Sequence, residues 1–284
     1  MIANYFSYDG ISSEVYNVVI GSFTGADDGT QEMGNVDITT VKAPHSNNFL
    51  KANATYNNPL MITFSIMKLN CADSTDYIFS EREIGFISRW LARKDYKKLK
   101  FFQDGWESIH YNAIMKVNQH MVGGECVGFD ITATCDAPWG YDQEQTTNID
   151  ASSGHADVLI YDDSDEIGVL FPRVEIDVFA AGDIEITNNF TGKKTKIRNC
   201  VAGEKIVLDK LSITSTECRP VYDRDVYDYD GKHKTLFNDF NWEWPSIANY
   251  FTPNNTRDSR VNRYVVNGNC KIRMTWESPR KAVI

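Results

Sequence analysis

SEREIGFISRWLARKDYKKLKFFQD, residues 80–104, is the stretch that decides the fold of this 284-residue chain. It opens with Ser80 and Glu83, which have the spacing of a capping box that satisfies free backbone N–H groups at the start of a helix. Apolar residues then recur at helical spacing: Ile84, Ile87 and Leu91, widened by Phe86 and Trp90. Residues 97–104 follow as a strand. The stretch therefore predicts one amphipathic helix that covers a β-sheet.

Most of the remaining chain before residue 142 is predicted to form that sheet. Residues 60–70 alternate apolar and polar side chains, which is typical of a half-buried strand. Residues 43–59 are polar and turn-rich, and we expect a loop or a projecting hairpin there. Residues 110–121 and 126–138 read as two further strands, joined at a Gly-Gly turn. The first predicted domain, residues 1–141, is therefore α+β.

The second half of the chain is predicted to be all β, so the fold class is mainly β. Residues 142–168 are polar and acidic and form either a linker or an extra strand. Residues 169–284 contain short strands at roughly ten-residue spacing, which predicts a β-sandwich.

The charge balance argues against nucleic-acid binding. The chain has 29 Lys and Arg against 39 Asp and Glu, a net charge of −10, whereas binding to phosphates needs clustered cations. The basic cluster Ala92–Lys100 suits the C-terminal end of a helix dipole. The first residues lack the pattern of a signal peptide, and no segment has the roughly 18 apolar residues of a membrane span. We therefore expect cytoplasmic synthesis, no membrane partner, and buried, reduced thiols at the six cysteines.

No motif for catalysis, a cofactor or a metal is found. The five histidines are scattered, and there is no phosphate-binding loop or nucleophile elbow. The acidic runs at residues 162–166 and 223–230 lack the glycine and glutamate that a calcium loop needs, so they are predicted to be solvated turns. The sequence therefore predicts neither an enzyme nor a cofactor-binding or metal-binding protein.

Two alternatives use residues of the second domain. Trp242 and Trp244 would share one face of a strand and form a sugar-stacking platform, although a core position is the commoner role. A glycoside hydrolase would need a pair of carboxylates, for which Glu175, Glu185 and Glu243 are the candidates.

The order of the parts resembles the phage distal tail protein family, the baseplate-hub proteins of long-tailed phages and prophages. The stretch at residues 80–104 carries part of this resemblance. Four other stretches carry the rest: FSYDGISSEVYNVVI (6–20), FDITATCDAPWGYD (129–142), FPRVEIDVFAAGDIEITNNFTGKKTKI (171–197) and NGNCKIRMTWESPR (267–280). Residues 221–264 look expanded relative to that family.

This resemblance implies a structural virion protein at the tip of a phage or prophage tail. The first domain would build a ring, a homo-hexamer, that joins the tail tube to the baseplate and adsorption apparatus and lets DNA pass. The second would be a galectin-like β-sandwich. The implied partners are further copies, the tail tube protein, and tail-tip, tail-fibre or receptor-binding proteins. Two alternatives stay open: a hub of a contractile tail or bacteriocin-like particle, and a protein that binds a host surface glycan through the sandwich.

Overall fold

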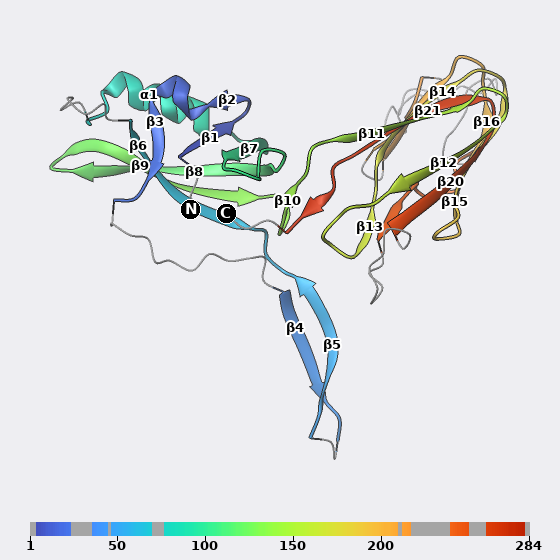
Figure 1. Ribbon diagram of the computed structural model, residues 1–284, viewed down its shortest axis with the longest axis horizontal. Helices are drawn as coiled ribbons and strands as arrows, with labels where there is room; N and C mark the ends of the chain where they lie inside the picture. The colour runs from blue at the N-terminus through green and yellow to red at the C-terminus, as the bar shows by residue number, and fades with distance from the viewer. Residues whose placement is uncertain are drawn as a thin grey trace, which may run out of the picture. The chain divides into compact units, whose positions relative to one another are not determined.

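The computed structural model describes residues 4–23, 36–44, 47–69, 77–209, 212–216, 239–249 and 260–281. The chain forms two compact units: Met1–Gln143 together with Pro279–Ile284, and Glu144–Ser278 (Figure 1). Both consist mainly of antiparallel strands, and the described residues contain one α-helix, which confirms the predicted fold class. The finer comparison of the second unit with galectins stays a prediction.

The first unit is built on a seven-stranded antiparallel sheet. Its strand order is β2-β1-β7-β8-β9-β6-β3. The bounds are β1 Tyr5–Tyr8, β2 Ile11–Ser12, β3 Val18–Gly21, β6 Met61–Lys68, β7 Lys97–Phe102, β8 Tyr111–Val122 and β9 Glu125–Cys135. The two longest strands, β8 and β9, form the predicted hairpin, and Gly123 and Gly124 turn the chain with positive φ angles of 64° and 90°.

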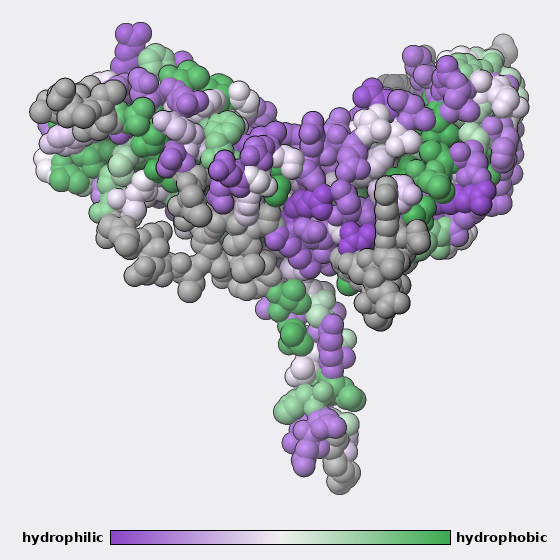
Figure 2. All heavy atoms as spheres, in the orientation of Figure 1, coloured by the Kyte–Doolittle hydropathy of each residue, from purple (hydrophilic) through white to green (hydrophobic). Residues whose placement is uncertain are grey.

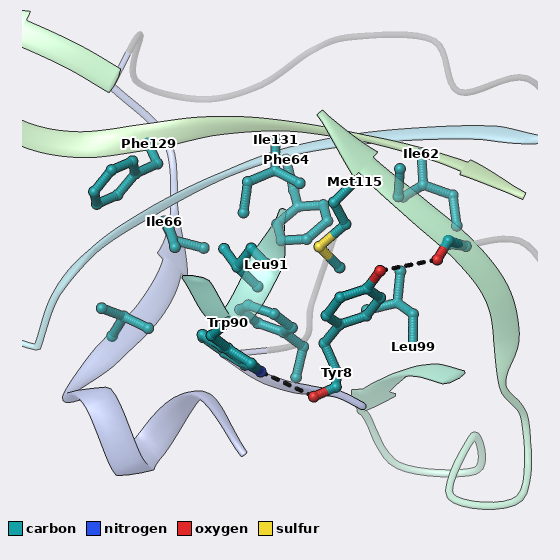
Figure 3. Packing of buried hydrophobic residues seen from close by; sticks show 14 of the residues in the cluster. Tyr8, Ile62, Phe64, Ile66, Trp90, Leu91, Leu99, Met115, Phe129 and Ile131 are labelled. Atoms are coloured by element: carbon teal, nitrogen blue, oxygen red, sulfur yellow. Dashed lines mark hydrogen bonds between the residues drawn. The ribbon is translucent and has the colours of Figure 1, made fainter. Parts of the chain in front are cut away.

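One face of this sheet is covered by α1 (Glu81–Leu91), which begins with the predicted capping box. Ser80 Oγ accepts the backbone N–H of Glu83 at 3.4 Å, and a Glu83 carboxylate oxygen accepts the Ser80 N–H at 2.7 Å. Ile87, Trp90 and Leu91 are buried, and they join the strand residues in one hydrophobic core (Figure 3). The helix therefore begins and packs as the sequence indicated.

Trp90 lies at the centre of this core. Its ring stacks on Phe6 at 5.4 Å and on Tyr16 at 4.8 Å between centroids. Its indole Nε1 donates a hydrogen bond of 2.9 Å to the carbonyl of Tyr8 in β1, drawn as a dashed line in Figure 3. Tyr8 in turn donates from its hydroxyl to the carbonyl of Ala113 in β8 at 3.0 Å. The helix is thus attached to two strands by specific contacts as well as by burial.

Phe86 does not belong to the buried stripe, so that part of the helix prediction was wrong. Its side chain is 39% exposed, and the guanidinium groups of Arg82 and Arg89 lie over its ring at 5.4 and 5.9 Å. On a helix of 3.6 residues per turn, Phe86 is displaced by about 100° from Ile87, which places it at the edge of the stripe. The two arginines there offer the ring a cation–π environment instead of a core position.

Two small ladders complete the first unit. β10 (Gly140–Tyr141) pairs with β22 (Pro279–Arg280), and the Arg280 guanidinium donates to the Asp142 carboxylate at 2.6 Å, which attaches the returning end of the chain. β4 (Val36–Lys42) and β5 (Phe49–Tyr56) form a hairpin that is a two-stranded sheet of its own.

The second unit is a β-sandwich, as predicted. One sheet has the order β11-β21-β14-β17-β18 and the other β12-β20-β15-β16, and a short pair, β13-β19, lies beside them. The bounds are β11 Gln145–Ala151, β12 His155–Tyr161, β13 Gly168–Leu170, β14 Arg173–Val178, β15 Gly182–Asn188, β16 Lys193–Cys200, β17 Lys205–Asp209, β18 Ser212–Ser215, β19 Ile247–Asn249, β20 Val261–Asn267 and β21 Cys270–Trp276. Alternate residues of both sheets meet in one core.

Residues 142–168, which the sequence left as a linker or an extra strand, contain β11 and β12, one edge strand of each sheet. Burial alternates along these two strands although their composition is polar. Ile149, Ala151 and Ile160 point into the core, and their neighbours are largely exposed. An edge strand that buries only a few side chains has few apolar residues to reveal it.

The cysteines within the described ranges are buried thiols. Cys126, Cys135, Cys200 and Cys270 form no disulfide there, as expected. Burial raises the pKa of Cys135 to about 12 and that of Cys270 to about 11, so both stay protonated at neutral pH.

Candidate assembly surfaces

The seven-stranded sheet has a second face, directed away from α1. Along β6, Ile62, Phe64 and Ile66 are buried on the helix side, whereas Met61 and Thr63 are exposed on the other side. Lys98 and Lys116 are exposed in the same way on β7 and β8. Because successive side chains of a strand point to opposite faces, this alternation leaves a polar sheet surface with a few apolar side chains.

Almost every residue of the hairpin β4–β5 is exposed. Figure 2 shows green, hydrophobic residues along it among purple, hydrophilic ones. Four large apolar side chains are more than half exposed: Ile38 64%, Val41 55%, Phe49 66% and Leu50 59%. Isolated two-stranded hairpins are at best marginally stable in water, so this one needs a surface against which to bury these side chains.

Register places these side chains on both faces of the hairpin. Ile38 pairs with Ala54 and Lys42 with Phe49, and both pairs lie on one face. Val41 pairs directly with Leu50 on the opposite face. A loop or a projecting hairpin is predicted from the sequence at residues 43–59, but nothing in the sequence marks these side chains as a contact surface. The signal that could have revealed the first strand of the hairpin is the run VDITTVK at residues 36–42, in which β-branched residues predominate.

Ser65, Asp130 and His120 form a polar cluster that superficially resembles a catalytic triad. Ser65 donates to one oxygen of Asp130 at 2.6 Å, and His120 Nδ1 lies 3.0 Å from the other. Burial works against ionisation of Asp130, but these two hydrogen bonds outweigh it and lower its pKa. The carboxylate, not the imidazole, is the middle group, so Ser65 lies against a carboxylate whose lowered pKa makes it a weak base, and the imidazole binds that carboxylate instead of the hydroxyl.

The two tryptophans predicted as a sugar platform do not share a strand face. Trp242 is 53% exposed and has a positive φ of 58°, and the chain from 241 to 246 is not a strand. Trp244 is partly buried against the core, with its ring 5.0 Å from that of Phe240. The side-chain amide of Asn241 explains the path of the chain, because it binds the backbone of β16 at Lys194 and Lys196. Sugar stacking by Trp242 and Trp244 stays a prediction.

The three carboxylates considered for hydrolysis each form an ion pair. Glu175 on β14 binds Arg173 at 2.9 Å. Glu185 on β15 binds Lys194, and Glu243 binds Lys193, both at 2.8 Å. Glu175 belongs to one sheet of the sandwich and Glu185 to the other, so the structure does not bring all three together.

The acidic run at residues 162–166 is not a solvated turn throughout, which corrects the expectation for Asp162. That residue is 1% exposed, and one of its carboxylate oxygens accepts the Ser164 hydroxyl at 2.5 Å. Burial raises its pKa, and its other oxygen has no hydrogen-bond partner within the described part of the chain. Asn249 binds the same turn from β19, donating to the carbonyls of Ser164 and Glu166 at 2.9 and 3.1 Å. The other acidic run, residues 223–230, lies outside the described residues.

Within the described ranges, no helix has the length and apolar character of a membrane span. The described residues also contain no cluster of three or more His, Cys, Asp or Glu side chains that could bind a metal ion.

Comparison with known families decides the class of protein. Residues 1–137 match a family described as "Phage tail protein N-terminal domain", and residues 139–276 match one described as "Phage tail C-terminal domain". The two matches together cover almost all of the chain. This chain belongs to that family of phage tail proteins. It is therefore a structural component of a phage tail, as the resemblance of its motifs implied.

The fold of this phage tail protein is similar to that of a solved tail component. The structure is titled as that of Dit (gp 19.1) of phage SPP1, "a Paradigm of Hub Adsorption Apparatus in Gram-positive Infecting Phages". The TM-score is 0.60 at 13% identity, and the match covers 96% of this chain and 98% of that one. No curated protein sequence matches this chain. The likeness shows that both units follow the Dit-type fold in the same order.

Proposed function

We propose that this phage tail protein is a distal tail hub that assembles into a closed ring of six copies. The ring would join the tail tube to the adsorption apparatus and leave a central passage for DNA. Its role is structural and not enzymatic. The proposal combines the family membership and the Dit-type fold with the exposed hairpin β4–β5 of the first unit.

The exposed hairpin is the observation that best supports the formation of a ring. A ring is held by one repeated contact between two different patches of each subunit. The hairpin offers one such patch, because Ile38 and Phe49 are exposed on one face and Val41 and Leu50 on the other. Two apolar faces are covered most simply when a neighbouring copy contacts the hairpin from both sides. Fully burying a side chain such as Phe49 or Leu50 contributes about 1.5–3 kcal/mol, so covering these four partly exposed side chains would contribute several kcal/mol towards the cost of association.

The charge of the chain agrees with passage of DNA. At a net charge of −10 it does not offer the clustered cations that hold phosphates. Synthesis in the bacterial host followed by incorporation into the virion is part of this proposal, as are contacts with the tail tube protein and with tail-tip or receptor-binding proteins. A hub of a contractile tail or of a bacteriocin-like particle would use the same ring.

The test compares the mass in solution of the parent chain with that of two hairpin variants, Phe49→Ser and Leu50→Ser. The parent should form a species of six copies with a central hole in negative-stain images. Each variant should weaken assembly at least about tenfold, since about 1.4 kcal/mol corresponds to a factor of ten. Leu159→Ser is the matched control, because Leu159 is 53% exposed on β12 of the second unit. Unchanged assembly of both hairpin variants would overturn the hairpin contact.

A further inference from the structure

The outer face of the five-stranded sheet in the second unit contains a hollow of about 570 Å³. Four neighbouring strands line it: β11, β21, β14 and β17. Its polar lining side chains include Asn148, Asp150, Glu175, Lys205, Lys271 and Arg273. Pockets for small ligands have volumes of about 300–1,000 Å³, so the hollow is large enough for a few sugar rings.

Strand register arranges the lining in rows. Asn148, Arg273, Glu175 and Val207 are consecutive cross-strand partners and form one row. The alternate residues of the same strands, such as Ile149, Ile176 and Ile272, are buried in the sandwich core. The polar groups therefore stand on a packed sheet that fixes their spacing at roughly 4.5–5.5 Å.

In the next row, the charged side chains form ion pairs with one another. Lys271 binds Asp150 at 3.4 Å, and Lys205 binds Asp177 at 3.6 Å. In the first row, Arg273 and Asn148 form no ion pair or side-chain hydrogen bond with other described residues, although Glu175 on the far side of Arg273 is bound by Arg173. An amide and a guanidinium thus lie side by side with up to seven N–H donors and one carbonyl acceptor available to a ligand.

We propose that this hollow binds a neutral saccharide. Its carboxylates and cations alternate and balance, so a polyanion would meet Asp150, Asp177 and Glu175, and a polycation would meet Lys205, Lys271 and Arg273. A neutral ligand with many hydroxyls can donate to the carboxylates and accept from Arg273 and Asn148 at the same time. None of the described residues that line the hollow is aromatic, so recognition by this lining rests on hydrogen bonds.

This site adds a binding function to the proposed hub. One site of this kind should be weak, with a dissociation constant of about 1 mM. Several copies in one ring would bind a repetitive cell-surface glycan more tightly, because each binding event raises the effective concentration for the next. Only this increase in affinity through several copies rests on the proposed function, since one chain contains all the residues that line the hollow.

The experiment titrates the full-length chain with maltotriose, chitotriose and cellotriose, and with glycerol phosphate as an anionic probe, using NMR chemical shifts. At least one trisaccharide should bind saturably, and Arg273→Gln and Asn148→Ala should each weaken binding about tenfold or more. Arg198→Gln, at an exposed arginine on β16 of the other sheet, should leave binding unchanged.

Three results would overturn the proposal. The first is no saturable binding of any trisaccharide up to about 20 mM. The second is binding that Arg273→Gln leaves unchanged while the variant keeps its fold by circular dichroism. The third is a preference for glycerol phosphate over all three trisaccharides. None of these results depends on whether the chain forms a ring.

Discussion

Replacing Trp90 by alanine should unfold the first unit far more easily than replacing Phe86, although both residues lie on α1. Trp90 is 1% exposed, stacks on Phe6 and Tyr16, and donates a hydrogen bond to the carbonyl of Tyr8. Truncating a buried Trp costs about 3–5 kcal/mol, and the lost hydrogen bond adds about 1 kcal/mol. Phe86 is 39% exposed, so its truncation should cost less than about 1 kcal/mol.

Urea unfolding followed by circular dichroism measures the difference, and hydrogen exchange assigns each transition to one unit. With a slope of about 2 kcal/mol per molar urea, Trp90→Ala should lower the midpoint of the first unit by about 2–3 M. Trp90→Phe keeps most of the buried volume and should lower it by less than about 1 M, which provides a folded variant if the alanine variant fails to fold. Equal losses for Trp90→Ala and Phe86→Ala would refute the placement of α1 on the sheet.

Three further predictions concern single contacts. Ser80→Ala should lower the free energy of unfolding of the first unit by about 0.5–2 kcal/mol in urea titrations, because the capping hydrogen bonds of α1 are lost. Asn262→Ala should destabilise the second unit by about 3 kcal/mol, because buried Asn262 binds both the N–H and the carbonyl of Ala248; a loss below about 1 kcal/mol would contradict this role. Asp162→Asn should raise the stability of the second unit at pH 7. Burial raises the folded-state pKa of Asp162 above that of the unfolded chain, so ionisation disfavours the folded state as pH rises. The gain should vanish below about pH 3.9, where both states are protonated, and a gain independent of pH would contradict this explanation.

The helix and the strands with regular alternation were predictable from the sequence. The capping residues of α1 and the alternation of Ile62, Phe64 and Ile66 are local signals, and local chemistry decides those elements. The predicted burial of Phe86 was wrong because periodicity gives the direction of a side chain only to within a fraction of a turn. The sequence also does not show that Arg82 and Arg89 lie over its ring.

The candidate surfaces were harder to predict, because they depend on register. The sequence does not reveal that Phe49 lies on the same face of the hairpin as Ile38, or Leu50 on the same face as Val41, since pairing of β4 with residues 49–56 decides this. The same holds for Asn148, Arg273 and Glu175, which are far apart in sequence and become neighbours only through three strands of one sheet. Asp162 was expected in solvent because five polar residues follow one another, and its burial depends on β19, about 85 residues away.

The central claim is that copies of this chain form the ring at the end of the tail tube. Cryo-electron microscopy of tail tips from the phage that encodes it tests this claim most directly. The account predicts one closed ring of six copies around an open channel, with the hairpin β4–β5 of each copy buried against the next. A single copy at the tip, or a ring in which Phe49 and Leu50 remain in solvent, would contradict it.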